Sequence, residues 1–220
     1  MVRFDRVTVR YDGKAIIEDV SFEIALRDKV VFYGKSGSGK TTILTTILGA
    51  HIPVEGTVYF DGEALNAINI LRVRRSVSYI GQEPVLGAEK ILDAILLPFT
   101  FKVNRDRAPQ EDRIVELLER LHLSRDILNK DASVVSGGEK QRVAIVRELL
   151  QNKEIFLVDE LTSALDRESK GAVLDLFRDS SYTLVSVSHD PEWYGICSRF
   201  LQVDGGRLVR SSDHPDKTYL

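Results

Sequence analysis

The sequence has 220 residues, of which 43% are hydrophobic and 29% are charged, and its formal net charge is -3. This composition is typical of a globular protein and excludes a disordered or fibrous chain, while the slight acidic excess argues against direct nucleic-acid binding, which usually needs a strong basic excess. The single cysteine, Cys197, excludes an intrachain disulfide, and the early charges at Arg3 and Asp5 exclude a signal peptide there.

The first third of the chain predicts two long strands, a short buried strand and a helix. Apolar and polar residues alternate over Val2–Tyr11 and Ala15–Leu26, as in strands, with a kink expected near Glu18. The apolar run Lys29–Tyr33 ends in glycine, which is typical of a buried parallel strand. A helix with one apolar face is expected over Thr41–Ala50. Further strands are expected at Gly56–Phe60 and Ser76–Ile80.

The middle of the chain is helical in pattern. Gln110–His122 is strongly amphipathic, and shorter or weaker helices are expected at Ser124–Asn129 and Gly138–Asn152. The best apolar run of the chain, Ile91–Phe101, is too short for a bilayer, which takes about 20 residues. We therefore expect a soluble protein of a reducing compartment, with a helical lobe inserted between strand-rich segments.

The last third returns to alternating strands and helices. Buried strands are expected at Ile155–Val158 and Thr183–Val187, with the helix Arg167–Arg178 between them. A terminal hairpin is expected around Asp204-Gly205-Gly206, and the polar tail after Arg210 is expected to fray. The strands of this hairpin would be Phe200–Val203 and Arg207–Val209.

The segment Gly34–Thr41, here called the phosphate loop, reads GKSGSGKT and matches G-x-x-x-x-G-K-[ST] at every fixed position. It follows a predicted strand and opens a predicted helix, so its backbone N–H groups and the helix dipole would face phosphate oxygens. Lys40 would neutralise the β- and γ-phosphates, and the Thr41 hydroxyl would bind Mg²⁺. The sequence therefore predicts ATP binding and hydrolysis; a chance glycine-rich turn is the alternative. The predicted nucleotide contacts are Gly34, Lys35, Ser36, Gly37, Ser38, Gly39, Lys40, Thr41 and Thr42.

Guanine selectivity is not expected. Asn129-Lys130-Asp131-Ala132 resembles the guanine-reading N-K-x-D, but alanine stands at its fourth position.

Two carboxylates, Asp159 and Glu160, follow the apolar strand Ile155–Val158. Sheets of alternating strands and helices bind ligands at the carboxyl ends of their strands. Asp159 is suited to hold Mg²⁺, and Glu160 is suited to act as general base on the attacking water. Two solvated carboxylates at a strand end are the alternative, which the nearby phosphate loop disfavours.

The segment Ser136-Gly137-Gly138 offers a second anion cradle, because serine caps the following helix and two glycines expose backbone N–H groups beside it. One ATP does not need two cradles from the same lobe. Taken alone, the segment could be an ordinary helix cap.

In order and rough spacing, these segments resemble the nucleotide-binding subunit of an ATP-binding-cassette (ABC) transporter over nearly the whole chain. The resemblance implies an α/β fold, with a P-loop NTPase (RecA-like) core, an N-terminal antiparallel β subdomain and an inserted α-helical subdomain. Residues 1–82 and 153–220 would form the core with the β subdomain, and residues 83–152 the helical subdomain, within a single domain 1–220. The matching segments are the phosphate loop, Gln82, Ser136 to Arg142, Asp159-Glu160, Ser163 to Asp166, and Ser188-His189-Asp190.

The resemblance also implies roles for single residues. Tyr11 would stack on adenine, although an ordinary strand-end aromatic is the alternative. Gln82 would contact Mg²⁺ and the attacking water and would sense the membrane partner. His189 would contact the γ-phosphate. Catalysis is thus expected from Glu160, His189, Lys40 and Gln82, and metal binding from Thr41, Gln82 and Asp159.

The same resemblance implies a role for the second anion cradle, Ser136-Gly137-Gly138. Ser136 and Gly138 would cap the γ-phosphate of ATP bound to the opposite subunit, and Asp166 would link the two sites across the dimer. Two copies of the chain are therefore expected to sandwich two ATP molecules. Val135, Glu139 and Leu161 depart from the residues usual in the family, but the catalytic positions are all present.

Partners and location follow from the family. The resemblance implies a separate membrane-spanning permease subunit, a homodimer when ATP is bound, and a cytoplasmic location on the inner face of the cell membrane. Glu83 to Phe101 would form the groove for the permease, unless these residues only fill the core. The motifs look most like a bacterial iron-export type.

Three rival functions fit the motifs less well. A soluble ABC ATPase acting on nucleic acid or ribosomes usually carries two cassettes, a coiled-coil insert or zinc-binding cysteines. A regulatory subunit that only binds ATP would not need Glu160 and His189. A small-molecule kinase would have no use for Ser136 to Arg142.

Overall fold

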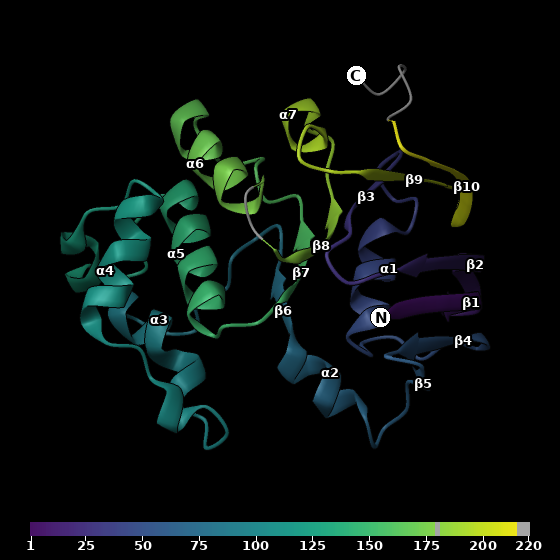
Figure 1. Cartoon of the computed structure of the whole chain (residues 1–220), viewed down its shortest axis with the longest axis horizontal. Helices are drawn as coiled ribbons and strands as arrows, with labels where there is room; N and C mark the ends of the chain where they lie inside the picture. Colours follow the sequence, from purple (N-terminus) through teal and green to yellow (C-terminus); the bar gives the residue numbers. More distant parts are fainter. Residues whose placement is uncertain (179–180, 215–220) are drawn as a thin grey trace.

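The computed structural model describes residues 1–178 and 181–214, which form two β-sheets with helices packed around them (Figure 1). The smaller sheet is antiparallel, with strand order β2-β1-β4-β5. Strand β2 bends where Asp19 takes a positive φ of 52°, next to a shift in its register with β1. The expected kink is therefore present. The strands are β1 (Val2–Tyr11), β2 (Lys14–Ile24), β4 (Glu55–Phe60) and β5 (Glu63–Ala64).

The larger sheet has the strand order β10-β9-β3-β8-β7-β6. Five neighbouring strands run parallel, and only β10 pairs antiparallel, with β9. The parallel strands end in turn at the same edge of the sheet. Their bounds are β3 (Lys29–Tyr33), β6 (Val77–Ile80), β7 (Ile155–Asp159), β8 (Thr183–Val187) and β9 (Arg199–Asp204), followed by β10 (Arg207–Ser212).

Both faces of the larger sheet are buried, as the continuous apolar runs of its strands predict. In β3, Val30 and Phe32 pack into a core shared with helix α1 and the smaller sheet. Val31 and Tyr33 point the other way, into a core shared with the later helices. Successive residues of one strand thus hold two layers together.

Helices α3, α4 and α5 all lie between β6 and β7 in the chain. Figure 1 shows them gathered beyond β6, on the side of the molecule away from the antiparallel sheet. None of the helices within the described ranges is long and apolar enough to cross a membrane. The helices are α1 (Lys40–Ile47), α2 (Ile70–Ser76), α3 (Ile91–Thr100), α4 (Glu111–Arg120), α5 (Gly137–Leu150), α6 (Arg167–Arg178) and α7 (Pro191–Tyr194).

Some sequence-based expectations need correction. The expected helix Ser124–Asn129 is a 3-10 helix, Arg125–Asn129. The chain does not fray directly after Arg210, because β10 continues to Ser212, which pairs with Phe200. The rest of the expected tail, residues 215–220, lies outside the described residues. Backbone pairing with β9 holds Ser211 and Ser212 in place without needing apolar side chains.

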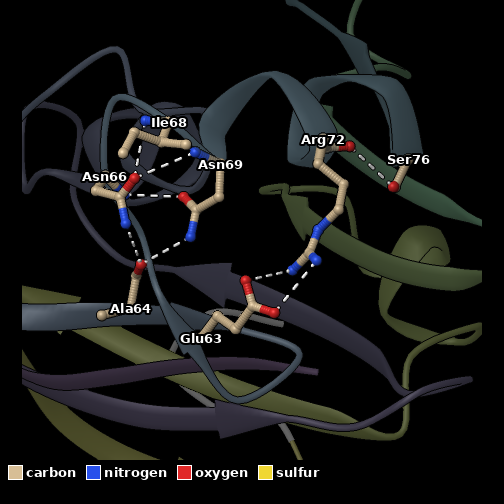
Figure 2. A network of polar contacts seen from close by, with 7 residues as sticks. All are labelled: Glu63, Ala64, Asn66, Ile68, Asn69, Arg72 and Ser76. Atoms are coloured by element: carbon tan, nitrogen blue, oxygen red, sulfur yellow. Dashed lines mark hydrogen bonds and ion pairs between the residues drawn. The ribbon is translucent and has the colours of Figure 1, made fainter.

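Helix α2 was not predicted because only one of its residues, Val73, is buried. Polar contacts hold it instead (Figure 2). Asn69 Nδ2 donates to the Ala64 carbonyl at 2.9 Å, and the Arg72 guanidinium forms an ion pair with Glu63 at 2.9 Å. Such polar contacts leave no periodic hydrophobic signal in the sequence.

The aromatic packing behind β7 gives a stability prediction. Phe156 is fully buried, and its ring centroid lies 5.5 Å from that of Phe177. We expect Phe156→Ala to lower the free energy of unfolding by about 3–5 kcal/mol, because it leaves a cavity in a close-packed core. Urea unfolding measures this. The exposed control Val209→Ala should change stability by less than about 0.5 kcal/mol, and a loss below about 1 kcal/mol for Phe156→Ala would contradict the packing.

Candidate nucleotide site at the carboxyl edge of the parallel sheet

The candidate site lies where three neighbouring parallel strands end. In the registers of β3, β8 and β7, Phe32 lies opposite Val187, and Val187 lies opposite Asp159. The next residues along these strands are therefore neighbours as well. They lead into the phosphate loop after β3, to Glu160 directly after the last β7 residue Asp159, and to Ser188-His189 after β8.

The phosphate loop is shaped by glycines at tight contacts. Gly34 has a φ of 138°, and a Cβ on it would lie 2.1 Å from the Val203 carbonyl oxygen of β9. Gly39 caps α1 with a φ of 100°, and a Cβ there would lie 2.7 Å from Ile17 of β2. Any side chain at either position would collide with backbone or core. The two sheets thus clamp the loop from both sides.

Inside the loop, Lys40 Nζ donates to the carbonyl oxygens of Gly34 and Lys35, each at 2.8 Å. Burial lowers the pKa of Lys40, although Glu160 and Asp159 act in the opposite direction. The buried Ser38 hydroxyl has no hydrogen-bond partner among the residues the structure describes. The oxygens of a bound phosphate group could accept hydrogen bonds from both Lys40 Nζ and the Ser38 hydroxyl, since both side chains belong to a loop whose backbone N–H groups also favour an anion.

The first two predicted metal ligands meet directly. Thr41 Oγ1 donates to Asp159 Oδ2 at 2.8 Å. Burial raises the pKa of Asp159, and the Thr41 hydrogen bond only partly offsets this. A carboxylate that is poorly solvated favours a nearby cation.

The donor set fits Mg²⁺ shared with a nucleotide. Hydroxyl, amide and carboxylate oxygens are the ligands that this ion prefers, and it usually binds through one or two carboxylates together with phosphates. In the described part of the chain, no group of three or more His, Cys, Asp or Glu side chains could hold a metal. Thr41, Asp159 and Gln82 would therefore need phosphate oxygens and water to complete a shell.

Glu160 lies at the centre of the remaining polar residues. Gln82 Nε2 donates to Glu160 Oε2 at 3.0 Å, and His189 Nε2 lies 3.7 Å from Glu160 Oε1. Glu160 has a positive φ of 49°, and its N–H donates to the Val187 carbonyl at 2.9 Å. A cavity of about 200 Å³ beside it is lined by Glu160, Thr162, Ser163, Ser188, His189 and Asp190.

The loop carrying His189 is held by residues that the sequence reasoning missed. Asp190 accepts hydrogen bonds from Thr162 Oγ1 at 2.9 Å and from the Glu192 N–H at 3.0 Å, which caps α7. Lys170 of α6 lies 3.0 Å from Asp190 and 2.9 Å from Glu192. Burial alone would raise the pKa of Asp190, but the bonds from Lys170 and Thr162 outweigh it and the pKa is lowered. Asp190 followed by Pro191 is a helix-start pattern that could have indicated the cap.

The second cradle, here called the signature turn (Ser136–Gly138), begins α5 as expected. Ser136 Oγ accepts from the Glu139 N–H at 3.2 Å, and Glu139 Oε2 accepts from the Ser136 N–H at 2.7 Å, which forms a capping box. Glutamate at position 139 therefore serves the cap well. The Ser136 hydrogen bonds, backbone first, lower the pKa of Glu139.

The signature turn packs against the loop after the acidic pair, because a Cβ on Gly138 would lie 3.0 Å from the Ala164 carbonyl oxygen. Asp166, at the end of that loop, caps α6 by accepting from the Ser169 N–H at 2.9 Å and the Ser169 hydroxyl at 2.7 Å. These bonds lower the pKa of Asp166 to about 2. Arg142 of α5 lies 3.8 Å from Asp166. The signature turn and Asp166 thus share one region of this chain.

Tyr11 ends β1 in the smaller sheet and is 69% exposed. Its strand pairs with β2, which touches the phosphate loop at Ile16 and Ile17, and Ile17 lies opposite Val9. The exposed Tyr11 ring is therefore accessible to a ligand, and it lies a few residues along β1 from the point where β2 contacts the phosphate loop.

The sequence matches the family model described as ABC transporter over residues 17–163. It is 38% identical over 94% of its length to "Mycobactin import ATP-binding/permease protein IrtB" of Mycolicibacterium smegmatis, and the match covers 37% of that protein. It is 32% identical to "Probable iron export ATP-binding protein FetA" of Escherichia coli, over 80% of this chain and 79% of that protein. A third relative, "Lactococcin-A transport/processing ATP-binding protein LcnC" of Lactococcus lactis, is 28% identical over 93% of this chain and 29% of its own length. The chain thus spans about a third of the length of IrtB and LcnC.

Solved structures match the whole fold. A dimeric ATP-binding cassette in a post-hydrolysis state, bound to ADP and Pi, superposes with a TM-score of 0.85 and 28% identity, over 98% of this chain and 100% of that chain. An ATP-bound bacterial Atm1-family ABC exporter gives a TM-score of 0.86 and 27% identity, over 97% of this chain and 39% of that chain.

The contacts of Lys170 give a pH-dependent prediction. Lys170→Met leaves Asp190 without its cation, so we expect the free energy of unfolding at pH 7 to fall by about 1–2 kcal/mol. Because the folded pKa of Asp190 is lowered, its contribution to stability is present above the ordinary value of 3.8 and is lost as the pH falls through the folded pKa. Urea unfolding measured from pH 7 to pH 3 should therefore show that the difference in the free energy of unfolding between Lys170→Met and the unsubstituted chain becomes smaller. The exposed control is Lys102→Met; an undiminished difference at pH 3 would contradict the prediction.

Proposed function

The chain belongs to the ABC transporter family, and from this premise we propose that it is the ATP-hydrolysing subunit that drives transport through a separate membrane-spanning permease. Members of this family hydrolyse ATP and dimerise, and one of the matched structures is a dimer holding ADP and Pi. The observation that carries the proposal is the contact set at the sheet edge. Thr41 touches Asp159, and both Gln82 and His189 lie beside Glu160.

The residues of the phosphate loop would bind and orient the triphosphate. Lys40 Nζ would exchange its two loop carbonyls for the β- and γ-phosphate oxygens, which are stronger acceptors because they are charged. Backbone N–H groups from Gly34 to Thr42 would complete the cradle. Mg²⁺, when bound, would neutralise phosphate charge as it develops; Thr41, Asp159 and Gln82 would hold it.

Hydrolysis would depend on Glu160. Its carboxylate would take the proton of the attacking water, and the Gln82 amide and the His189 imidazole, 3.0 and 3.7 Å away, would orient that carboxylate and the γ-phosphate. Asp190, held by Thr162 and Lys170, would keep the imidazole in place.

We propose that two copies complete each site. The signature turn packs against Ala164 of its own chain, and within the described residues no hydrogen bond or ion pair joins it to its own phosphate loop. In a head-to-tail dimer, Ser136 and Gly138 would cap the γ-phosphate of ATP held by the partner's loop, and Tyr11 would stack on adenine within its own chain. Asp166, which lies 3.8 Å from Arg142 of α5, would be the link between sites.

A groove of about 510 Å³ supports the proposed permease contact. It lies between α3, α5 and β6 and is lined partly by Leu97, Pro98 and Phe101. Other residues of α3 face the core instead: Ile91, Ala94, Ile95 and Phe99 fill it. A docked permease would place the chain at the inner face of the cell membrane. The division at residues 83 and 152 into core and helical subdomain stays a prediction.

The cargo is not a property of this site. An iron export protein is among the relatives, as the resemblance predicted, beside proteins named for mycobactin import and methionine import. A shared ATPase site serves all of these. Of the rival functions, an ABC ATPase acting on nucleic acid has no counterpart among these named relatives.

The role of Glu160 predicts a trapped dimer. Glu160→Gln keeps the side-chain size and removes the base, so we expect hydrolysis to fall by about a hundredfold or more while ATP binding persists. Phosphate release measures the first effect, and sedimentation with Mg²⁺-ATP should show a dimer. Glu168→Gln, at an exposed carboxylate of α6, is the matched control. A strictly monomeric Glu160→Gln variant with unchanged hydrolysis would refute the assignment.

The role of Lys40 predicts a loss of affinity. Lys40→Ala removes the cation from the phosphate loop, and we expect the dissociation constant for ATP to rise at least tenfold, the usual effect of losing a hydrogen bond between charged groups. A titration with fluorescent ATP measures this, with the exposed Lys102→Ala as control. Unaltered binding would remove the phosphate-loop assignment.

A further inference from the structure

Gln141 is a buried polar residue to which the proposed mechanism gives no role. It is the fifth residue of α5 and is 1% exposed. Its Nε2 donates to the Gly81 carbonyl oxygen at 3.2 Å, while its Oε1 is buried without a hydrogen-bond partner among the described residues. Burying an unpaired amide oxygen costs free energy, and each such group calls for an explanation. A methionine would fill similar space without that cost, so packing alone does not account for this glutamine.

The bond made by Gln141 ends beside the proposed catalytic base. Gly81 follows the last residue of β6, the edge strand of the larger sheet, and directly precedes Gln82. Gln82 in turn donates to Glu160 at 3.0 Å. Three consecutive links, Gln141 to Gly81, Gly81 to Gln82 and Gln82 to Glu160, therefore connect α5 to the carboxylate.

The other end of this connection is the signature turn. Ser136 and Gly138 begin the same 14-residue helix, and Gln141 lies about one turn after Gly138. A continuous helix moves as one body, so a displacement of the signature turn displaces Gln141 with it. The hydrogen bond to Gly81 would transmit that displacement to Gln82.

We propose that Gln141 is a positioning residue that couples the place of the signature turn to the place of Gln82, and so to Glu160 of the same chain. This inference rests on the proposed function, since it assigns a regulatory link within that ATPase site. When the signature turn seats on the partner's ATP, the pull through Gln141 sets Gln82 and Glu160 in the chain's own site. Capping in one site and hydrolysis in the other are then linked through a single side chain.

Two variants separate this role from packing. Gln141→Met removes the donor and keeps the volume, and Gln141→Glu keeps the shape and replaces the donor by an acceptor that faces the Gly81 carbonyl. We expect each to lower kcat about five- to tenfold, the usual effect of one lost hydrogen bond, with KM for ATP within about twofold. Gln151→Leu, at the other end of α5, where Gln151 bonds only Arg147 and Glu148 of its own helix, is the matched control.

The thermal unfolding midpoint supplies a readout apart from activity. Because Gln141→Met removes a buried unpaired oxygen, we expect its midpoint to equal or exceed that of the unsubstituted chain while kcat falls. A Gln141→Met variant with unchanged kcat would overturn the proposal. If this variant does not fold, Gln141→Glu, which preserves the shape, carries the same test.

A double-mutant cycle tests the route. Gln82→Ala removes the hydrogen bond to Glu160. In that background, Gln141→Met should therefore lower kcat by less than about a further twofold. Losses that multiply would show that Gln141 acts elsewhere and would overturn the proposal. Mg²⁺-ATP hydrolysis by the unsubstituted chain is measured first; its absence would count against the proposed function, and the cycle is interpreted only where it is present.

Discussion

The parallel pairing of β3, β8 and β7 is the constraint on which the rest of this structure depends. Parallel strands carry their carboxyl ends to the same edge of a sheet, so the loops that follow them must meet there. The phosphate loop follows β3, Ser188-His189 follows β8, and the acidic pair lies at the end of β7, whose last residue is Asp159. Burial of both faces of the sheet fixes the strand register, and the register sets which loop residues face each other. The site is therefore a consequence of sheet geometry before any ligand binds.

Several polar groups of the site bond one another. Lys40 bonds carbonyls of its own loop, Thr41 bonds Asp159, and Gln82 bonds Glu160. The buried ones among them, Lys40 and Asp159, are paired, as polar groups in a protein interior usually are. Under the proposed function, a nucleotide and its metal ion would exchange these bonds for others of similar or greater strength. Binding would then require little rearrangement of the backbone at the phosphate loop. Gln82 and Gln141 would couple the site to α5.

Most strands and the longer helices were predictable, because each has a recognisable hydrophobic pattern within a short stretch of sequence. Alternation gave β1, continuous apolar runs gave β3 and β8, and the 3.6-residue period gave α4. Short elements held by polar contacts were not predicted. Helix α2 depends on the contacts of Asn69 with Ala64 and of Arg72 with Glu63, and α7 has only four residues after its Asp190 cap. Neither produces a periodic pattern.

The candidate site divides in the same way. The sequence by itself determined the family. It also predicted Lys40, Thr41, Asp159, Glu160 and His189 as site residues, because each lies in a contiguous motif whose spacing is set by local backbone geometry. Only the tertiary structure decided which side chains support them. Lys170 reaches Asp190 from another helix, and Gln141 reaches Gly81 across the boundary between helical lobe and sheet. These contacts join residues far apart in the chain, and packing alone brings such residues together, so no local pattern could reveal them.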